Sequence, residues 1–400
     1  MRVLLACQTA TNKGDRAIAE YIISQLLSQG HEVVLSATRP DLWETAKDQN
    51  VEVIPMGYKS IYRNMQSRVL KKILRIISRL VCDKLLFANL ISPKGNHRLC
   101  NRVSREFIQQ VKAADLVIVT GGHHITSIRE KNALFQFTYD IGLISLYAKR
   151  YALWAQTIGP LEFTAKRAKN FFEKVLKNAD RVFIRDENSR DCVKKLYGDL
   201  QNITKTCDTV FGFGNQEFPA VSQREKKVGI AIFDGLKKAF STYETIAAML
   251  DSYAEKGYEI EFFRMEYNDY ELSNIHKVVN FMKQKAKITI HPFMTTTEAH
   301  LKEVASCRYF IGYKTHSVIM ALTTATPLIA IAYHEKTNDF MRDYGLEDYA
   351  IPDEELNIEK AEKCMQLLEE NAEAIHAKQK EVSRAIAEVL QKDLFEMVRL

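Results

Sequence analysis

The sequence predicts an α/β fold with two Rossmann-like domains. Short apolar runs of strand length recur along the chain, and segments with helical periodicity separate them. This alternation begins twice, first at residue 3 and again at residue 228, after a polar stretch. Because alternating strands and helices build parallel sheets with helices on both faces, two such series predict two doubly wound domains.

The first series opens with a strand at residues 3–7, a polar turn that contains glycine, and a helix at residues 17–28. The remaining strands of this series are expected at residues 30–36, 51–54, 116–119, 151–156 and 181–185. Together these elements predict an N-terminal domain at residues 1–215.

The second series follows a polar stretch at residues 216–227, whose Pro219 and charged run are typical of a linker. The C-terminal domain is expected at residues 228–374. Its elements are strands at residues 228–233, 259–263, 308–313 and 327–333 and helices at residues 241–256 and 317–324. Residues 358–400 have a polar helical pattern, and the part at residues 375–400 is expected to cross back onto the first domain.

The composition is that of a globular chain without a nucleic-acid signature. The 400 residues are 46% hydrophobic and 26% charged, enough for two cores, and the net charge of +6 comes from basic residues mixed with acidic ones. So modest a charge favours small anionic substrates or a membrane surface over nucleic acid. The seven cysteines are scattered without a CxxC pair, which argues against a zinc site or a disulfide framework and predicts a cytoplasmic location. The first residues form a strand pattern rather than a signal peptide, and no apolar run reaches membrane-spanning length.

Residues 63–90 form a basic amphipathic pattern. Apolar residues dominate, and basic residues recur at helical spacing at Arg68, Lys72, Arg75 and Arg79. A helix of this kind can lie on an anionic membrane, where an enzyme acting on a lipid-linked acceptor would work, and this would place the protein at the inner face of the cell membrane. The slightly favoured interpretation is a core helix with one exposed basic face.

Residues 309–336 place titratable side chains directly after two buried strands. The first strand ends at a Lys-Thr-His-Ser tetrad, and the second ends at Tyr-His-Glu-Lys. Ligands of parallel sheets collect beyond the carboxyl ends of the strands, so Lys314, His316 and Lys336 are expected at one edge, with Ser317 at a helix N-terminus. His316 can take or give a proton there, and the two lysines can hold a phosphate and a carboxylate. The alternatives are a packing or capping histidine and solvated lysines.

Four further residues are candidates in the first domain after its strands. Arg185 ends a strand and can supply a bidentate anion contact, or it can form a salt bridge with Asp186. Gly121 and Gly122 permit a ligand to approach the backbone closely, or they form a plain turn. His123 follows them and is expected to line the acceptor side of the site, with a surface loop as the alternative.

The loop between the first strand and the first helix supplies two more candidates for substrate binding, Asn12 and Asp15. For Asp15 the favoured role is that of a helix cap.

The order of these patterns resembles the polysaccharide pyruvyl transferase family, in which a strand ends in G-x-R-x-H-S, a helix follows, and then P-x-x-x-x-x-Y-x-x-K. Here the pattern stands as Gly312, Lys314, His316, Ser317, Pro327, Tyr333 and Lys336. The other landmarks lie in the same order at residues 12–15, 117–122, 156–160, 184–189 and 207–208. Lys314 departs from the family's arginine and would bind an anion as a point charge, without the fork of a guanidinium.

The resemblance implies a GT-B-like architecture, in which two Rossmann-like domains face each other across a cleft, and it implies ketal pyruvyl transfer. The pyruvyl group of phosphoenolpyruvate would move onto a sugar of a polysaccharide or lipid-linked glycan precursor, and phosphate would leave. Arg185, Lys314 and Lys336 would then hold the donor, and His316 would transfer a proton. No cofactor and no metal is implied. Two alternatives stay open: a GT-B glycosyltransferase that uses a nucleotide sugar, and a non-catalytic relative that binds glycans or partners.

Overall fold

The computed structural model describes residues 1–9, 11–58, 104–128, 131–134, 136–232, 240–284 and 286–399. By their contacts the residues form two compact units. Unit 1 consists of Met1–Ala10, Ile18–Thr209 and Lys392–Leu400, and unit 2 consists of Thr11–Ala17 and Val210–Gln391. The basic segment at residues 63–90 lies outside the described residues, so its two interpretations stay predictions.

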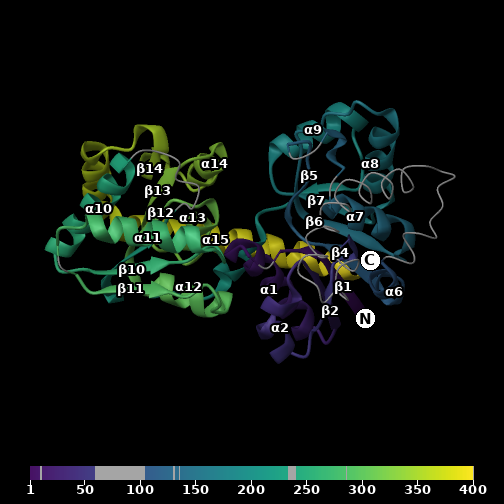
Figure 1. The fold of residues 1–400 in the computed structure, drawn as a ribbon, viewed down its shortest axis with the longest axis horizontal. Coiled ribbons are helices and arrows are strands. Elements are labelled where there is room, and N and C mark those ends of the chain that lie inside the picture. Colours follow the sequence, from purple (N-terminus) through teal and green to yellow (C-terminus); the bar gives the residue numbers. More distant parts are fainter. Residues whose placement is uncertain are drawn as a thin grey trace, which may run out of the picture. The chain divides into compact units, whose positions relative to one another are not determined.

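Unit 1 is built on a parallel sheet (Figure 1) with the strand order β3-β2-β1-β4-β6-β7-β8, and β5 also pairs with β6. The strands are β1 (Arg2–Gln8), β2 (Glu32–Ala37), β3 (Glu52–Pro55), β4 (Leu116–Val119), β5 (Gly122–Ile125), β6 (Tyr151–Ile158), β7 (Arg181–Ile184) and β8 (Ile203–Lys205). The helices of this part are α1 (Lys13–Ser28), α2 (Glu44–Asp48), α6 (Arg105–Ala113), α7 (Gln136–Tyr147), α8 (Lys166–Asn178) and α9 (Glu187–Tyr197), with 3-10 turns η1 (Pro40–Leu42) and η4 (Lys131–Ala133).

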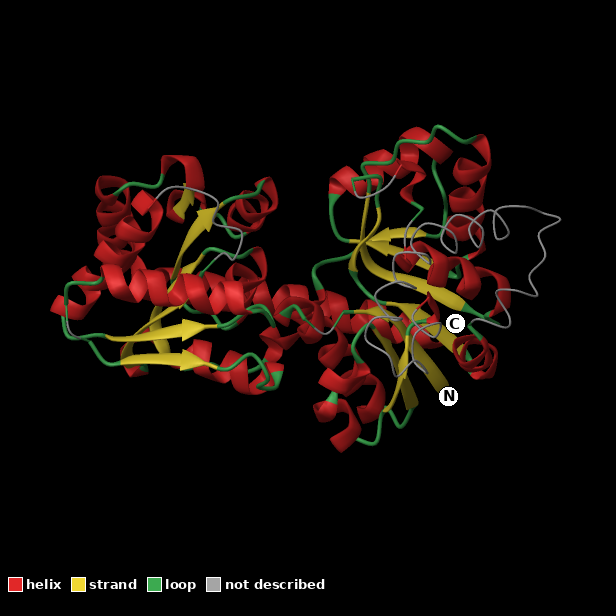
Figure 2. Cartoon of the chain, viewed as in Figure 1, coloured by secondary structure: helices red, strands yellow, loops and turns green. Residues whose placement is uncertain are grey.

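Unit 2 has a second parallel sheet with the order β11-β10-β9-β12-β13-β14, which is the strand order of a Rossmann fold. Its strands are β9 (Glu225–Ala231), β10 (Glu259–Phe263), β11 (Ile288–His291), β12 (Cys307–Gly312), β13 (Leu328–Ala332) and β14 (Ala350–Pro352). Its helices are α10 (Phe240–Glu255), α11 (Asp269–Phe281), α12 (Thr297–Ser306), α13 (Thr315–Thr323), α14 (Glu335–Asp343) and α15 (Ile358–Arg399), with 3-10 turns η5 (Thr209–Asn215), η6 (Val221–Gln223), η7 (Glu347–Tyr349) and η8 (Asp353–Glu355). In each unit, helices flank the sheet (Figure 2), so the predicted α/β class with two parallel-sheet domains is confirmed.

Helix α1 begins earlier than the sequence pattern predicts. The expected start was residue 17, whereas the helix begins at Lys13. The side-chain oxygen of Asn12 accepts hydrogen bonds from the backbone N–H groups of Gly14 at 2.9 Å and Asp15 at 3.2 Å, which satisfies donors of the first turn. Asn12 is therefore the capping residue, and the capping role expected for Asp15 is wrong because Asp15 lies inside the first turn.

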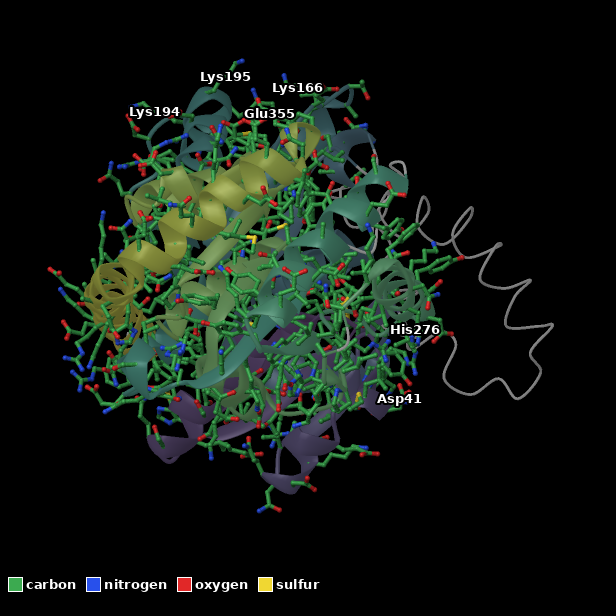
Figure 3. All side chains as sticks on the ribbon, turned by 90° about the vertical axis from the view of Figure 1, so that its left-hand side faces the viewer. Asp41, Lys166, Lys194, Lys195, His276 and Glu355 are labelled. Carbon is green, nitrogen blue, oxygen red and sulfur yellow. The ribbon has the colours of Figure 1, made fainter. Side chains whose placement is uncertain are left out.

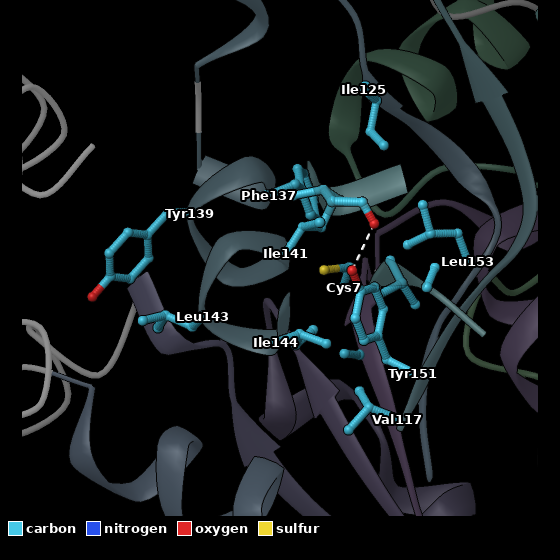
Figure 4. Packing of buried hydrophobic residues seen from close by; sticks show 14 of the residues in the cluster. Cys7, Val117, Ile125, Phe137, Tyr139, Ile141, Leu143, Ile144, Tyr151 and Leu153 are labelled. Carbon is cyan, nitrogen blue, oxygen red and sulfur yellow. Dashed lines mark hydrogen bonds between the residues drawn. The ribbon is translucent and has the colours of Figure 1, made fainter. Parts of the chain in front are cut away.

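A core of unit 1 lies between its sheet and several helices, among them α7. Figure 4 shows Cys7 of β1, Val117 of β4 and Leu153 of β6 among the side chains of Ile141 and Ile144 from α7, all of them buried. Both faces of a parallel sheet are covered by helices, which is why these strands are almost wholly apolar rather than alternating. Lysines of α9 are exposed at the surface of unit 1, as Figure 3 shows for Lys194 and Lys195.

Helix α15 is long, with 42 residues, and its apolar positions recur at helical spacing. The buried residues Ala361, Met365 and Leu368 belong to unit 2, whereas residues from Lys392 onward group with unit 1. There Asp393 accepts a hydrogen bond from the Thr206 hydroxyl at 2.8 Å. Of the helices that the structure describes, none combines the length and the apolar character that crossing a membrane requires.

Asp140 of α7 is a buried carboxyl group that should make the stability of the protein depend on pH. Burial raises its pKa from 3.8 to about 8, even though the N–H groups of Tyr58 and Gly57 both donate to it at 2.9 Å. A group whose pKa is raised by folding stabilises the folded state only below its unfolded pKa, and that stability is lost as the pH rises toward the folded value.

We therefore expect the Asp140→Asn variant, which cannot ionise, to flatten this dependence. Between pH values of about 4 and 8, the free energy of unfolding of the natural protein should fall, relative to the variant, by up to about 1.4 kcal/mol per pH unit. Urea unfolding of both proteins at several pH values in this range measures the difference. A constant difference across the range would show that Asp140 ionises normally in the folded protein.

Candidate functional site

The carboxyl end of β12 delivers three of the predicted residues to one edge of the unit 2 sheet. Helix α13 begins at Thr315, so His316 lies in its first turn, where its side chain is half-buried. Lys314 precedes the helix, and the buried Ser317 hydroxyl donates to the Lys314 carbonyl oxygen at 2.7 Å. This hydrogen bond stabilises the junction between β12 and α13.

Strand β13 lies beside β12 and brings Lys336 to the same edge. Helix α14 begins at Glu335, and its capping residue His334 accepts a hydrogen bond from the Lys336 backbone N–H at 3.3 Å. The hydroxyl groups of Thr315 and Thr337 are 3.0 Å apart and join the first turns of α13 and α14. Lys314, His316 and Lys336 therefore gather at one edge of the sheet, together with two helix N-termini (Figure 1), whose positive dipole ends favour anions.

The segment Thr11–Ala17, here called the strap, packs on unit 2 although it follows the first strand of unit 1. Its backbone bonds to the residues after β10: Lys13 N–H donates to the Met265 carbonyl oxygen at 2.9 Å, and Tyr267 N–H donates to the Thr11 carbonyl oxygen at 2.9 Å. Asn12 also pairs with Glu266 as an antiparallel bridge. The first residues of the strap are thus held to unit 2 by backbone hydrogen bonds.

Gly14 of the strap lies directly against His316. A Cβ atom at this position would be 2.0 Å from Cγ and 2.2 Å from Nδ1 of the imidazole ring, closer than atoms can approach. Only glycine leaves room for the ring where it stands. This contact brings together the two motifs that lie farthest apart in the sequence.

Lys314 is buried and already paired with a carboxylate. Its side chain is 7% exposed, and its Nζ atom is 2.9 Å from Oε1 of Glu266. The same oxygen accepts a hydrogen bond from Nδ2 of Asn12 at 2.6 Å. The alternative of a solvated lysine is therefore wrong for Lys314, because its ammonium group forms a charge-assisted hydrogen bond inside the protein.

A second carboxyl group, Glu271 of α11, lies behind Glu266 and is fully buried. It accepts hydrogen bonds from the backbone N–H groups of Met265 at 2.8 Å and Glu266 at 3.0 Å. Burial raises the pKa of Glu271 to about 7, against the opposite effects of the Lys314 charge and of these N–H donors. Glu271 fixes the backbone from which Glu266 reaches Lys314.

Lys13 is a buried cation of the strap that the sequence analysis did not single out. Its Nζ atom donates to the carbonyl oxygens of Phe293 at 2.8 Å and Thr295 at 2.5 Å, and it lies 5.5 Å from the centroid of the Phe293 ring. Burial and then the charge of Lys13 lower the pKa of the neighbouring His300 well below its usual value. Lys13 therefore adds positive charge to the interior beside this edge.

Glu266 was also missed, although a signal for it existed. It follows β10 by three residues, so the rule that predicted Lys314 at the carboxyl end of a strand applies equally to Glu266. For Lys13, the signal was its place between Asn12 and Gly14 in a loop that follows the first strand.

Arg185 stands at the carboxyl edge of the unit 1 sheet, directly after β7. Its guanidinium group forms an ion pair with the buried Asp208, and its Nε atom donates to the Thr157 hydroxyl at 3.0 Å. Asp186, the salt-bridge partner expected from the sequence, caps α9 by accepting a hydrogen bond from the Ser189 N–H at 2.8 Å. Arg185 is thus engaged within unit 1, and its side chain is 13% exposed.

The segment that contains Gly121, Gly122 and His123 lies at the same edge of unit 1 and includes the start of β5. A Cβ atom at Gly122 would be 2.5 Å from Nε2 of His124, so a close contact within the protein requires this glycine. His123 bonds through Nε2 to the carbonyl oxygen of Gly159. Across the described ranges, no group of three or more His, Cys, Asp or Glu residues is placed to hold a metal ion.

Solved structures of low sequence identity share this fold. The structure is similar to that of Anabaena HepE in complex with UDP-glucose, with a TM-score of 0.59, 8% identity, and coverage of 100% of this chain and 99% of that one. It is also similar to UDP-GlcNAc 2-epimerase from Methanocaldococcus jannaschii (TM-score 0.54, 10% identity, 91% of each chain covered). A glycosyltransferase from Rickettsia africae is a further neighbour (TM-score 0.53, 10% identity, 99% of this chain and 97% of that one covered). The predicted GT-B-like fold class is confirmed.

The sequence matches the family described as polysaccharide pyruvyl transferase over residues 12–335. This stretch begins in the strap at Asn12, includes Arg185 and His316, and ends one residue before Lys336. It covers most of the chain and parts of both units. The protein therefore belongs to the polysaccharide pyruvyl transferase family, a family of transferases that modify glycans.

Proposed function

We propose that this protein transfers the pyruvyl group of phosphoenolpyruvate onto two hydroxyl groups of a sugar in a polysaccharide or lipid-linked glycan precursor. The main support is the edge of the unit 2 sheet, where His316 stands among Lys314, Lys336 and two helix N-termini in a chain of this family. Phosphoenolpyruvate carries a phosphate and a carboxylate, and such an edge suits both anions.

The donor would bind through the half-buried Lys336 and the backbone N–H groups at the first turns of α13 and α14. Lys314 lies at the same edge, where its ammonium group is paired with the Glu266 carboxylate. Lys13 raises the potential from within the protein and does not need to touch the donor.

The reaction requires two proton movements. The first sugar hydroxyl adds to the central carbon of the donor and gives up its proton, while the methylene carbon gains a proton and becomes a methyl group. The second hydroxyl then attacks the same carbon and gives up its proton, the bond between that carbon and the phosphate oxygen breaks, and a cyclic ketal and hydrogen phosphate result. His316 is assigned to one of these proton transfers, since a histidine can act as acid or base near neutral pH.

The remaining predicted contacts are part of the same proposal. Asn12, Asp15 and Ser317 are proposed as substrate-binding residues of unit 2, and Arg185, Gly121, Gly122 and His123 as those of unit 1. Asn12, Ser317 and Arg185 also hold the protein's own structure, so their replacement would affect both folding and binding. A peripheral position at the inner face of the membrane belongs to the proposal, because a lipid-linked acceptor would be presented there.

The proposal is tested by thermal stability in the presence of small anions. Phosphoenolpyruvate at 100 times its dissociation constant should stabilise the protein by about 2.7 kcal/mol, because it binds only the folded state. The Lys336→Ala variant should lose most of this gain, whereas Lys195→Ala, which removes an exposed lysine from α9 of unit 1 (Figure 3), should keep it.

Stabilisation by UDP-glucose without any by phosphoenolpyruvate would instead identify a nucleotide-sugar enzyme. A loss of stabilisation in Lys195→Ala equal to that in Lys336→Ala would mean that the anion effect is not local to the edge of unit 2. Acceptor-dependent release of phosphate from phosphoenolpyruvate then measures the transfer itself.

A further inference from the structure

The Glu266 carboxylate forms an ion pair with the Lys314 ammonium group. The two groups are 2.9 Å apart, and their side chains are 19% and 7% exposed. An anion that approaches Lys314 therefore meets a cation that is already neutralised, and it also meets the negative charge of Glu266. Like charges at short range repel strongly where little water separates them.

The position of Glu266 is fixed from two sides. Glu271 holds the backbone N–H groups of Met265 and Glu266 from behind. The strap binds the same two residues through other groups: the Asn12 amide donates to the Glu266 carboxylate, and the Lys13 N–H donates to the Met265 carbonyl oxygen. This arrangement keeps a carboxylate beside Lys314 without depending on a flexible surface side chain.

We propose that Glu266 is a positioning residue that acts as a resident anion at Lys314, competing with the phosphate or carboxylate of the substrate. This inference rests on the proposed function, since it assumes that an anion binds at this edge. Before the donor binds, Glu266 holds Lys314 and the strap in place. When phosphate has formed, Glu266 pairs with the Lys314 ammonium group again, and this lowers the affinity of the site for the phosphate product.

A competing internal anion lowers the apparent affinity for the ligand in proportion to the strength with which it binds the cation. Such competition speeds the release of the product, because a product bound to an unpaired buried lysine would dissociate slowly. Product release limits kcat in many enzymes. Glu266→Gln isolates this effect, because glutamine keeps an oxygen for the Asn12 amide and removes the charge that opposes the ligand.

The experiment is a calorimetric titration of inorganic phosphate, and separately of phosphoenolpyruvate, into the full-length protein and four variants. Glu266→Gln should bind phosphate about tenfold more tightly than the natural protein, a coupling of the size usual between interacting sites. Lys314→Met should bind it more weakly. In the double variant Glu266→Gln/Lys314→Met, the gain from Glu266→Gln should be smaller than in the single variant, because no ammonium group is left to release and only the direct repulsion by Glu266 is relieved. The control Glu244→Gln, which removes one exposed charge from α10 of unit 2, should bind like the natural protein.

Steady-state kinetics provide the second readout, in which Glu266→Gln should lower KM for phosphoenolpyruvate and lower kcat. A residue with a purely structural role would weaken binding when replaced, so unchanged or weaker phosphate binding in Glu266→Gln overturns the inference, as does a gain that is undiminished without Lys314. Absence of phosphate binding by every variant overturns it too. Binding of phosphate without binding of phosphoenolpyruvate would instead contradict the proposed function and leave the resident-anion result standing.

Discussion

Replacing His316 with alanine is expected to lower kcat for pyruvyl transfer by about a thousandfold, the typical contribution of a positioned acid or base. His316 lies half-buried in the first turn of α13, with its ring against Gly14 and next to the residues proposed to hold the donor. Because His316 is assigned to proton transfer and not to anion binding, the stabilisation by phosphoenolpyruvate should change little. Phosphate release and thermal stabilisation, measured on the same preparation, separate the two effects.

The matched control is His276→Ala, which removes an exposed histidine of α11 in the same unit (Figure 3) and should leave kcat unchanged. If a folded His316→Ala variant transferred pyruvate at the full rate, the proton would have to come from another group. A loss of phosphoenolpyruvate binding with little change in kcat would assign His316 to donor binding instead.

The convergence of Lys314, His316 and Lys336 could be predicted because it depends on local patterns. Each of these residues follows an apolar run of strand length, and parallel neighbouring strands end at the same edge. The observed β12 and β13 differ from the expected ranges only at their ends, where caps rather than hydrophobicity decide the boundaries. For the same reason the early start of α1 was missed, since it depends on the side-chain oxygen of Asn12, which accepts hydrogen bonds from the N–H groups of Gly14 and Asp15.

The contacts between the strap and the rest of unit 2 could not be predicted, because the residues that meet are far apart in the sequence. Asn12 and Glu266 are 254 positions apart, and Lys13 and Phe293 are 280 apart. No periodicity in the sequence reports that the strap packs on unit 2 while the strand before it belongs to unit 1. Short strands were missed for a different reason: β8 has three residues and none is buried, so it has no apolar run to detect.

Gly14→Ala tests the link between the strap and His316, and we expect it to lower kcat by about a hundredfold, within the range for a displaced acid or base. Two effects on stability oppose each other. Alanine favours a helix over glycine by about 1 kcal/mol, whereas inserting a methyl group into a packed site costs about 1 to 3 kcal/mol. Since the Cβ atom would lie 2.0 Å from the ring, crowding should prevail, and the protein should stay folded with the His316 ring turned away.

The double variant Gly14→Ala/His316→Ala decides whether this explanation holds. Without the ring, the new methyl group has space, so the double variant should match His316→Ala in kcat and be no less stable than Gly14→Ala. Such non-additivity is expected only for residues that act through one contact. An activity of the double variant far below that of His316→Ala would show that the methyl group disturbs the strap itself, and full activity of Gly14→Ala would mean that the ring position observed here is not the one used in catalysis.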